Sequence, residues 1–291
     1  MVMRYADLYV QARKKLTDCA DPETASLYAR NLLCAALQKP YEAIVGQRDF
    51  YASEAECNYV FDGVERLLHE EPLAYILNEW DFCGSTFYVD RSVLIPRDDT
   101  CAVVSLAMNY ALFLDSTPRI LDLCTGSGCI GITVAKKIHD ARVTLADISR
   151  DALNVAKRNV KEHKLTDRIS CVCLDARQEA PAYLSKFDLI ISNPPYITTS
   201  EMETLDKSVR EYEPHLALHG GADGLDFYRA ISANFASVLK PGGYLCFEFG
   251  FGQADSVRRI LEENQYKVLD ISKDYTDKER AIIAQYGRKE A

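Results

Sequence analysis

The chain has 291 residues, 48% of them hydrophobic and 26% charged, which is an ordinary globular composition with enough length for two domains. Its formal net charge of −9 argues against a protein that grips long stretches of nucleic acid, because such proteins usually need a basic face. Ten cysteines without a CxxC pair, no apolar run near the roughly 20 residues that span a bilayer, and no signal-peptide pattern predict a cytoplasmic protein without a metal site or membrane segment.

The first part of the chain predicts a small helical domain over residues 1–71. Its first helical face carries apolar residues at spacings of three and four: Tyr5, Leu8, Ala12 and Leu16. Asp21 followed by Pro22 is a helix start signal, a capping oxygen and then a proline at the first helical position. Ser53 is placed to cap a third long helix, and residues 41–45 predict a short additional one.

A different pattern occupies residues 72–98, which we expect to form a linker between two domains. Two short strand-like runs, from Trp80 to Val89, flank Gly84 and Ser85. Such a spacing is typical of a β-hairpin.

From residue 99 to 291 strands and helices alternate. The expected strands are Arg119–Leu123, Arg142–Asp147, Arg168–Leu174, Phe187–Ser192, Gly243–Phe249, Tyr266–Ile271 and Arg280–Gln285. Helical patterns lie between the first five, among them 151–163 and 225–239. The alternation predicts an α/β domain with a mainly parallel sheet that binds its ligand beyond the carboxyl ends of the strands.

A glycine loop follows the first of these strands. In the run from Ile120 to Cys129, Gly126 and Gly128 allow a tight turn and a close approach of backbone to ligand. Asp147 ends the next strand about twenty residues later, where a carboxylate can accept hydrogen bonds from both hydroxyls of a ribose. The alternative is an ordinary strand-to-helix turn that contains glycines but binds no ligand. The full G-x-G-x-x-G and the P-loop lysine are absent, so a nucleoside without phosphates such as S-adenosylmethionine fits best.

A second motif, Asn193-Pro194-Pro195-Tyr196, directly follows an apolar strand and so lies at the same edge of the sheet. The Asn193 side-chain oxygen and the Pro194 carbonyl can each accept an N–H of a planar target nitrogen, which holds its lone pair towards an electrophilic methyl group. The prolines have no N–H to compete, and Tyr196 can pack against a planar group. A rigid turn after a strand is the structural alternative.

Together these residues resemble the class I S-adenosylmethionine-dependent methyltransferases, and most closely the peptide chain release factor glutamine methyltransferases. The resemblance covers nearly the whole chain and includes 71–77, 87–90, 94–97, 212–218, 220–224 and 274–280. It implies a Rossmann-like fold with a mixed, mostly parallel seven-stranded sheet. Cys124 and Asn78 stand where that family often has glycine.

The resemblance also implies the roles of particular residues. S-adenosylmethionine, which leaves as S-adenosylhomocysteine, is expected to be bound by Cys124, Thr125, Gly126, Ser127, Gly128, Asp147, Asp175, Ala176 and Asn193. The catalytic residues are then Asn193, Pro194 and Tyr196, and the substrate glutamine is bound by Asn193, Pro194, Pro195 and Tyr196. The implied partner is a class I release factor, modified at its Gly-Gly-Gln loop by a monomeric enzyme.

Three other functions remain as alternatives. A ribosomal-protein glutamine methyltransferase shares the tetrapeptide, and a DNA or RNA amino-methyltransferase would use the same chemistry on a flipped base. A binding module would keep the fold without the reaction. The sequence leaves open whether Glu248 faces the cofactor or is a partnered buried acid, and whether His215 has a role near the site.

Overall fold

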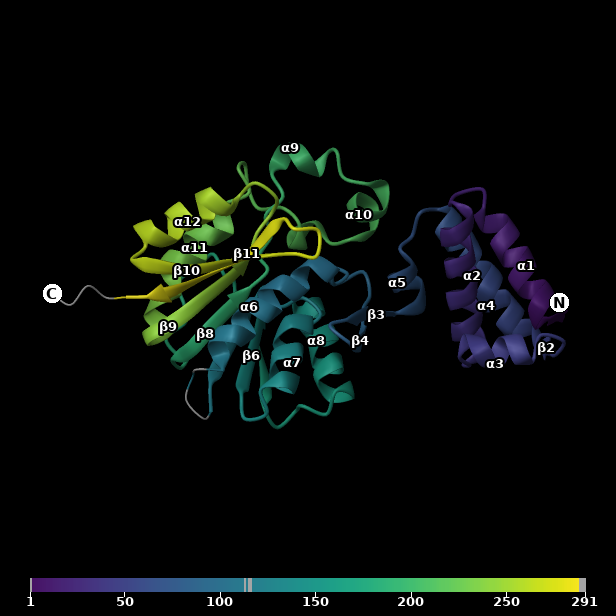
Figure 1. Cartoon of the computed structure of the whole chain (residues 1–291), viewed down its shortest axis with the longest axis horizontal. Coiled ribbons are helices and arrows are strands. Elements are labelled where there is room, and N and C mark those ends of the chain that lie inside the picture. The colour runs from purple at the N-terminus through teal and green to yellow at the C-terminus, as the bar shows by residue number, and fades with distance from the viewer. Residues whose placement is uncertain (1, 113, 115–116, 288–291) are drawn as a thin grey trace. The chain divides into compact units, whose positions relative to one another are not determined.

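The computed structural model describes residues 2–112, 114 and 117–287, so the outermost residues of the expected domains lie outside it. The chain forms two compact units, Met1–Asn78 and Glu79–Ala291, each with its own elements (Figure 1). Within the described residues no helix is long and apolar enough to cross a membrane.

The first unit is helical, as the sequence predicts. Its helices are α1 (Tyr5–Leu16), α2 (Pro22–Leu37), α3 (Tyr41–Gly46), α4 (Glu54–Leu68) and α5 (Leu73–Leu77). Two short strands, β1 (Met3–Arg4) and β2 (Tyr51–Ala52), pair antiparallel. All four apolar residues expected on the first helix face are buried in one core with residues of α2, α4 and α5.

Two side-chain caps define where the longer helices of this unit begin. The Asp21 carboxylate accepts the backbone N–H groups of Glu23 and Thr24, at 2.9 and 3.1 Å. Ser53 and Glu56 form a reciprocal capping box at the start of α4. These bonds satisfy amide groups that a helix start leaves without an internal partner, and they explain why both start signals were readable in the sequence.

The hairpin consists of β3 (Glu79–Phe82) and β4 (Ser85–Tyr88), and it belongs to the second unit. Its two turn residues are Cys83 and Gly84, one position earlier than expected, and both have left-handed backbone angles, as a tight hairpin turn requires. Phe82 and Phe87 are buried in the core of the second unit. The linker over 72–98 stays a prediction, and in the structure its hairpin packs within the second unit.

The second unit contains a seven-stranded sheet in the order β10-β11-β9-β8-β5-β6-β7. The strands are β5 (Arg119–Leu123), β6 (Arg142–Asp147), β7 (Ile169–Cys173), β8 (Phe187–Ser192), β9 (Leu239–Glu248), β10 (Tyr266–Lys273) and β11 (Glu279–Tyr286). Strands β7, β6, β5, β8 and β9 are parallel, whereas β11 runs antiparallel to both of its neighbours. The seven expected strands and the mixed sheet are confirmed.

Helices cover both faces of this sheet. The unit contains α6 (Cys101–Ala111), α7 (Cys129–Lys137), α8 (Arg150–Glu162), α9 (Thr199–Met202), α10 (Lys207–Tyr212), α11 (Asp226–Asn234) and α12 (Ala254–Glu263), with 3₁₀ turns at Asp98–Thr100, His215–Ala217 and Ala236–Val238. Helices α6, α7 and α8 pack on one apolar cluster, and α11 and α12 pack on the other (Figure 1). The helix expected over 225–239 ends at Asn234, since Leu239 already begins β9.

The strand order reverses at β5, which has β6 on one side and β8 on the other. In sheets of this type the loops after such strands diverge and leave a crevice at their carboxyl ends. Both sequence motifs follow strands at this point, so the fold brings them to the same crevice.

Candidate functional site

The glycine loop connects β5 to α7 and is held from the neighbouring strand. Cys124, Gly126 and Gly128 all have left-handed backbone angles, with φ of 58°, 53° and 82°. Residues other than glycine rarely adopt this conformation, which gives a physical reason why the resemblance implies a glycine at position 124. Gly128 is also the N-cap residue of α7.

Asp147 at the end of β6 holds this loop with one carboxylate oxygen and the turn before α8 with the other. One oxygen accepts the Gly126 N–H at 2.9 Å, and the other accepts the Ser149 N–H at 2.9 Å. Burial raises the pKa of Asp147 above its ordinary value, while the backbone N–H groups of Ser149 and Gly126 oppose this rise. Each oxygen retains a lone pair, so the carboxylate can still accept hydroxyl groups of a ligand.

Asp122 lies behind the loop and was not singled out in the sequence. Its Oδ2 accepts the Thr125 hydroxyl at 2.6 Å and the Gly131 N–H at 2.9 Å, which ties the beginning of the loop to the first turn of α7. The side chain is fully buried, and burial raises the pKa of Asp122 to about 7. The available signal was an acid inside an otherwise apolar strand, three residues before a threonine.

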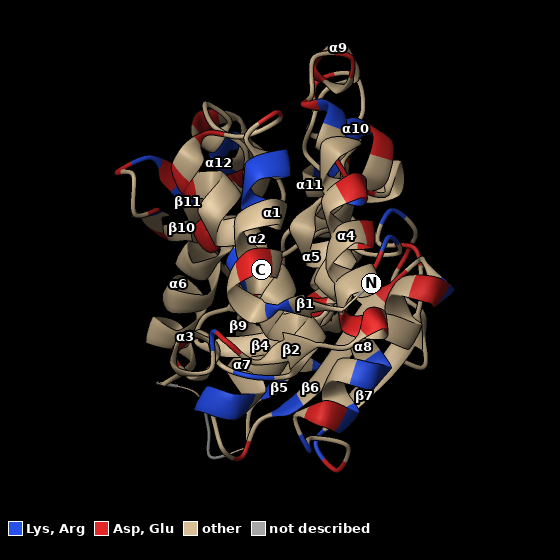
Figure 2. Ribbon diagram, turned by 90° about the vertical axis from the view of Figure 1, so that its right-hand side faces the viewer, with Lys and Arg blue, Asp and Glu red and all other residues tan. Residues whose placement is uncertain are grey.

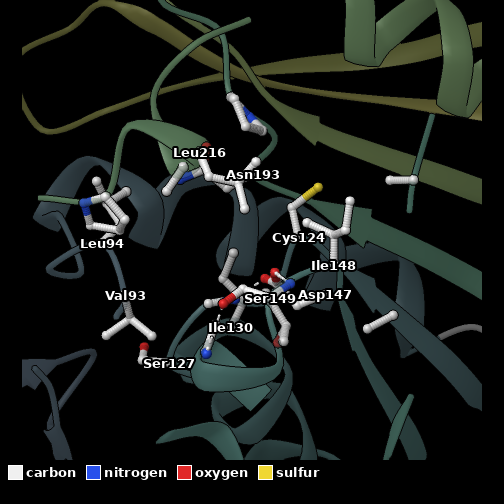
Figure 3. A pocket seen from close by; sticks show the side chains of 18 of the residues that line it. Val93, Leu94, Cys124, Ser127, Ile130, Asp147, Ile148, Ser149, Asn193 and Leu216 are labelled. Atoms are coloured by element: carbon white, nitrogen blue, oxygen red, sulfur yellow. Dashed lines mark hydrogen bonds between the residues drawn. The ribbon is translucent and has the colours of Figure 1, made fainter. Parts of the chain in front are cut away.

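A pocket opens above this loop at the carboxyl ends of β5, β6 and β8, and it encloses about 980 Å³ including its open mouth (Figure 3). Eight of the nine residues expected to contact the cofactor line it: Cys124, Thr125, Gly126, Ser127, Asp147, Asp175, Ala176 and Asn193. The ninth, Gly128, lies outside the lining and shapes the turn.

One wall of the pocket is apolar, and most of it was missed in the sequence. Ile148, Leu174, Ala176 and Phe227 line it together, and Phe227 comes from α11 about fifty residues further along the chain. Sequence patterns mark Phe227 only as an apolar position of a helix. Its place in the wall depends on how that helix packs on the sheet.

The tetrapeptide follows β8, with two of its residues at the pocket and two outside the lining. Asn193 and Pro195 line the pocket, whereas Pro194 and Tyr196 do not. The Asn193 side-chain nitrogen donates to the Thr100 hydroxyl oxygen at 3.3 Å. Tyr196 packs against the apolar cluster of α11 and α12, and burial raises its pKa. Its ring therefore supports the loop from the core side in this structure.

The tetrapeptide backbone is clamped by a second glycine-containing segment. A side chain at Gly220 would meet the Pro195 carbonyl oxygen and the Tyr196 Cα at 2.7 Å, and one at Gly224 would meet the Tyr196 carbonyl oxygen at 2.3 Å. The Gln253 amide donates to that same carbonyl oxygen at 3.1 Å. Only glycine permits backbone to pack so closely on backbone.

The remaining wall comes from two segments that the sequence analysis quoted without assigning them a role. Residues 92–97 and 214–217 both contribute to the pocket lining. They are joined by Glu213, which is buried and forms an ion pair with Arg97 while accepting the Ile95 N–H at 3.2 Å. Through these two contacts the buried Glu213 holds the two segments against each other.

His215 and Glu248, which the sequence left open, occupy different environments. His215 is exposed, and its Nε2 hydrogen-bonds with the Arg210 carbonyl oxygen at 2.8 Å. Glu248 is 1% exposed and lies beside Thr100 and Asn193, outside the pocket lining. Among the residues that the structure describes, no cluster of His, Cys, Asp and Glu could hold a metal ion.

Family models and curated relatives both match this chain, and together they identify its family. The PrmC N-terminal domain matches residues 7–77, and the methyltransferase small domain matches residues 105–222. A release factor glutamine methyltransferase of Clostridium acetobutylicum is 35% identical over 98% of this chain and 99% of its own length. Another of that name, from Geobacter sulfurreducens, is 44% identical over 77% of this chain and 76% of its own.

Solved structures support the fold alone. A methyltransferase from Pyrococcus furiosus has a TM-score of 0.52 at 18% identity, covering 77% of this chain and 98% of its own. A ribosomal protein L11 methylase from Lactobacillus delbrueckii subsp. bulgaricus has a TM-score of 0.50 at 16% identity, covering 69% of this chain and 84% of its own.

Proposed function

Because this chain belongs to the release factor glutamine methyltransferase family, we propose that it methylates the side-chain amide nitrogen of the glutamine in the Gly-Gly-Gln loop of class I peptide chain release factors. The methyl donor is S-adenosylmethionine. One observation carries the proposal: Asn193 of the tetrapeptide lines the same pocket as the glycine loop and Asp147. A group that can orient an amide nitrogen and a group that can bind a nucleoside therefore share one site.

The residues present fit S-adenosylmethionine in their chemistry. Asp147 offers carboxylate lone pairs to two vicinal ribose hydroxyls, and Ile148, Ala176 and Phe227 offer an apolar wall to a purine ring. Open space surrounds the Cα of Gly126, with no atom within 4 Å of where a side chain would stand. When bound, the cofactor supplies a methyl group on a positively charged sulfur.

The chain's own contribution to the reaction is to hold the target nitrogen. A glutamine amide nitrogen carries two N–H groups and a lone pair delocalised into its carbonyl. Asn193 Oδ1 and the Pro194 carbonyl oxygen each accept one of these N–H groups, which fixes the nitrogen and raises its electron density. No strong base is required, because the nitrogen becomes very acidic once methylated.

We further propose that the protein works as a monomer in the cytoplasm, where release factors act, and that the helical unit recognises the release factor. The helical unit carries a shallow exposed groove bounded by Tyr9, Arg13, Arg30 and Tyr41. Its two arginines outnumber its one acidic residue, Glu23, so the groove favours an acidic partner surface.

The direct test is methyl transfer from labelled S-adenosylmethionine to a panel of substrates. The panel contains a class I release factor, the same factor with the loop glutamine changed to alanine, the ribosomal-protein substrate of the sister enzymes, and unmodified DNA. We expect label on the release factor alone, and none on its glutamine variant. Label on the ribosomal protein or on DNA would replace the proposed substrate while keeping the fold and cofactor.

A further inference from the structure

The orientation of the Asn193 amide decides whether it can serve a glutamine substrate. An asparagine side chain ends in one acceptor oxygen and one nitrogen that carries two N–H donors. Turning the amide over by half a turn exchanges the positions of the oxygen and the nitrogen. Only the oxygen can accept an N–H of the target nitrogen. With the amide turned, a donor would face a donor, and the substrate would be repelled.

Thr100 occupies one of the two N–H donors of Asn193. The threonine ends the 3₁₀ turn before α6 and is 2% exposed. Its hydroxyl oxygen accepts from Asn193 Nδ2 at 3.3 Å. Since the hydroxyl accepts in this bond, its own proton is available to donate to another group.

Glu248 is the acid beside Thr100 and Asn193, and its side chain is buried. Both neighbours favour the charged form of its carboxyl group. A carboxylate has acceptors only, so it can take the Thr100 hydroxyl proton and the second N–H of Asn193 but cannot satisfy the asparagine oxygen. With Asn193 Nδ2 held on the core side by Thr100, Asn193 Oδ1 is the atom left to face the pocket.

The surroundings of Glu248 show that it is not retained as a structural ion pair. Arg280 is the nearby cation, and it already pairs with Asp99 and Asp274, each at 3.1 Å. The Oε2 atom of Glu248 is buried and has no hydrogen-bond partner within the described structure. A buried acid with an unused oxygen costs stability, which suggests a functional reason for its presence.

We propose that Thr100 and Glu248 are positioning residues that fix the Asn193 amide with its oxygen towards the substrate nitrogen. The inference rests on the proposed function, since it concerns the orientation that an amide substrate requires. It assigns a role to two residues that do not touch the reacting atoms themselves.

The protonation of Glu248 gives a signature that is independent of activity. Burial raises its pKa to about 7, against the opposing effects of Thr100, Arg280 and Asn193. Asp99 adds to the rise, and Tyr196, Tyr228 and Cys129 are the other titratable groups that sense this carboxyl. The pKa of this carboxyl group is higher in the folded protein than its value of about 4.3 in the unfolded chain. The folded protein therefore loses stability as the pH rises from about 4 towards 7.

The experiment compares two matched pairs of variants with the full-length protein and a release factor. Thr100→Val and Glu248→Leu remove the acceptor groups, and we expect each to lower kcat by roughly 10- to 100-fold. Thr100→Ser and Glu248→Gln keep an oxygen at each position and should recover most of that loss. The double variant Thr100→Val/Glu248→Leu should lose little more than either single variant, because both act through Asn193.

Two further measurements distinguish a role in positioning Asn193 from a role in the stability of the fold. The Kd for S-adenosylmethionine should stay within about threefold of the parent in the Glu248 variants, because Glu248 lies outside the pocket lining. The same is expected for Thr100→Val, because valine has the size of the threonine that lines the pocket. The Tm of Glu248→Gln relative to the parent should rise between pH 5 and pH 8, because the variant no longer carries the buried titrating carboxyl. Ser105→Ala, an exposed position on α6, serves as the control with parental behaviour.

The inference is overturned if Thr100→Val keeps the parental kcat, or if serine and glutamine fail to restore what valine and leucine remove. It is also overturned if the fall in kcat is fully explained by weaker cofactor binding or by a smaller fraction of folded protein. Failure of the proposed function would look different: the parent itself would then not label the release factor. The same variants would be compared on whichever amide or amine substrate the parent does methylate.

Discussion

The side-chain oxygen of Asn193 is the polar atom on which the proposed chemistry depends most. We expect Asn193→Ala to lower methyl transfer by roughly a hundredfold or more, because the target nitrogen loses a preorganised acceptor. The Kd for S-adenosylmethionine should change by less than about threefold, since Asp147 and the glycine loop remain. Single-turnover kinetics and equilibrium binding measure the two effects separately. Parallel loss of both would show that Asn193 serves the cofactor.

Asp147 has the opposite expected profile. Replacing it with alanine removes the carboxylate proposed to accept two ribose hydroxyls and also frees the Gly126 N–H. Hydrogen bonds to a charged group contribute about 1.5–3 kcal/mol each, so the Kd for S-adenosylmethionine should rise at least about tenfold. Calorimetric titration measures this directly. An unchanged Kd would place the nucleoside elsewhere in the pocket.

At the residue scale, the sequence is informative where one backbone angle restricts which residue fits. Asn78 and Cys124 stand where the resemblance implies glycine, and both adopt left-handed backbone angles, with φ of 57° and 58°. Thr100 and Phe227 were missed, because each reaches the site from an element distant in sequence. No local pattern records such a contact.

At the scale of elements, the sheet was predictable because its central strands are short runs of mostly apolar, buried residues. The boundaries of β5, β6 and β8 agree with expectation to the residue. The hairpin turn and the end of α11 were displaced, since those boundaries depend on packing and on where the next strand begins. The loop at 92–97 had no secondary-structure pattern and became a pocket wall through the buried Glu213.

The close packing of the Gly220 segment on the tetrapeptide yields an element-level prediction. Gly220→Ala places a methyl group 2.7 Å from the Pro195 carbonyl oxygen, so the two backbones must move apart. A shift of that kind should reduce kcat by at least about tenfold and lower Tm by several degrees.

Gly46→Ala is the matched control. Gly46 ends α3, and a side chain there would meet no atom within 4 Å. Parental kcat and Tm are expected for this variant. If Gly220→Ala behaved like Gly46→Ala in both turnover and thermal melting, the tetrapeptide would not depend on this clamp.

For the whole molecule, the proposal that the helical unit recognises the release factor can be tested with variants of that unit. The variant Arg13→Glu/Arg30→Glu reverses the charge of its exposed groove. We expect KM for the release factor to rise by about tenfold while kcat and the cofactor Kd stay parental, because the groove is proposed to bind substrate only. Arg48→Glu, an exposed charge of the same unit outside the groove, is the control. Equal KM values for both variants would assign recognition to another surface.

The position of the transferred methyl group tests the central claim most directly. After reaction with the purified protein and S-adenosylmethionine, the release factor would be digested and its Gly-Gly-Gln peptide sequenced by tandem mass spectrometry. The account predicts one added methyl group on the glutamine side-chain nitrogen, absent when Asn193→Ala replaces the parent enzyme. A methyl group on any other residue, or an unmodified peptide from a protein that binds the cofactor, would contradict it.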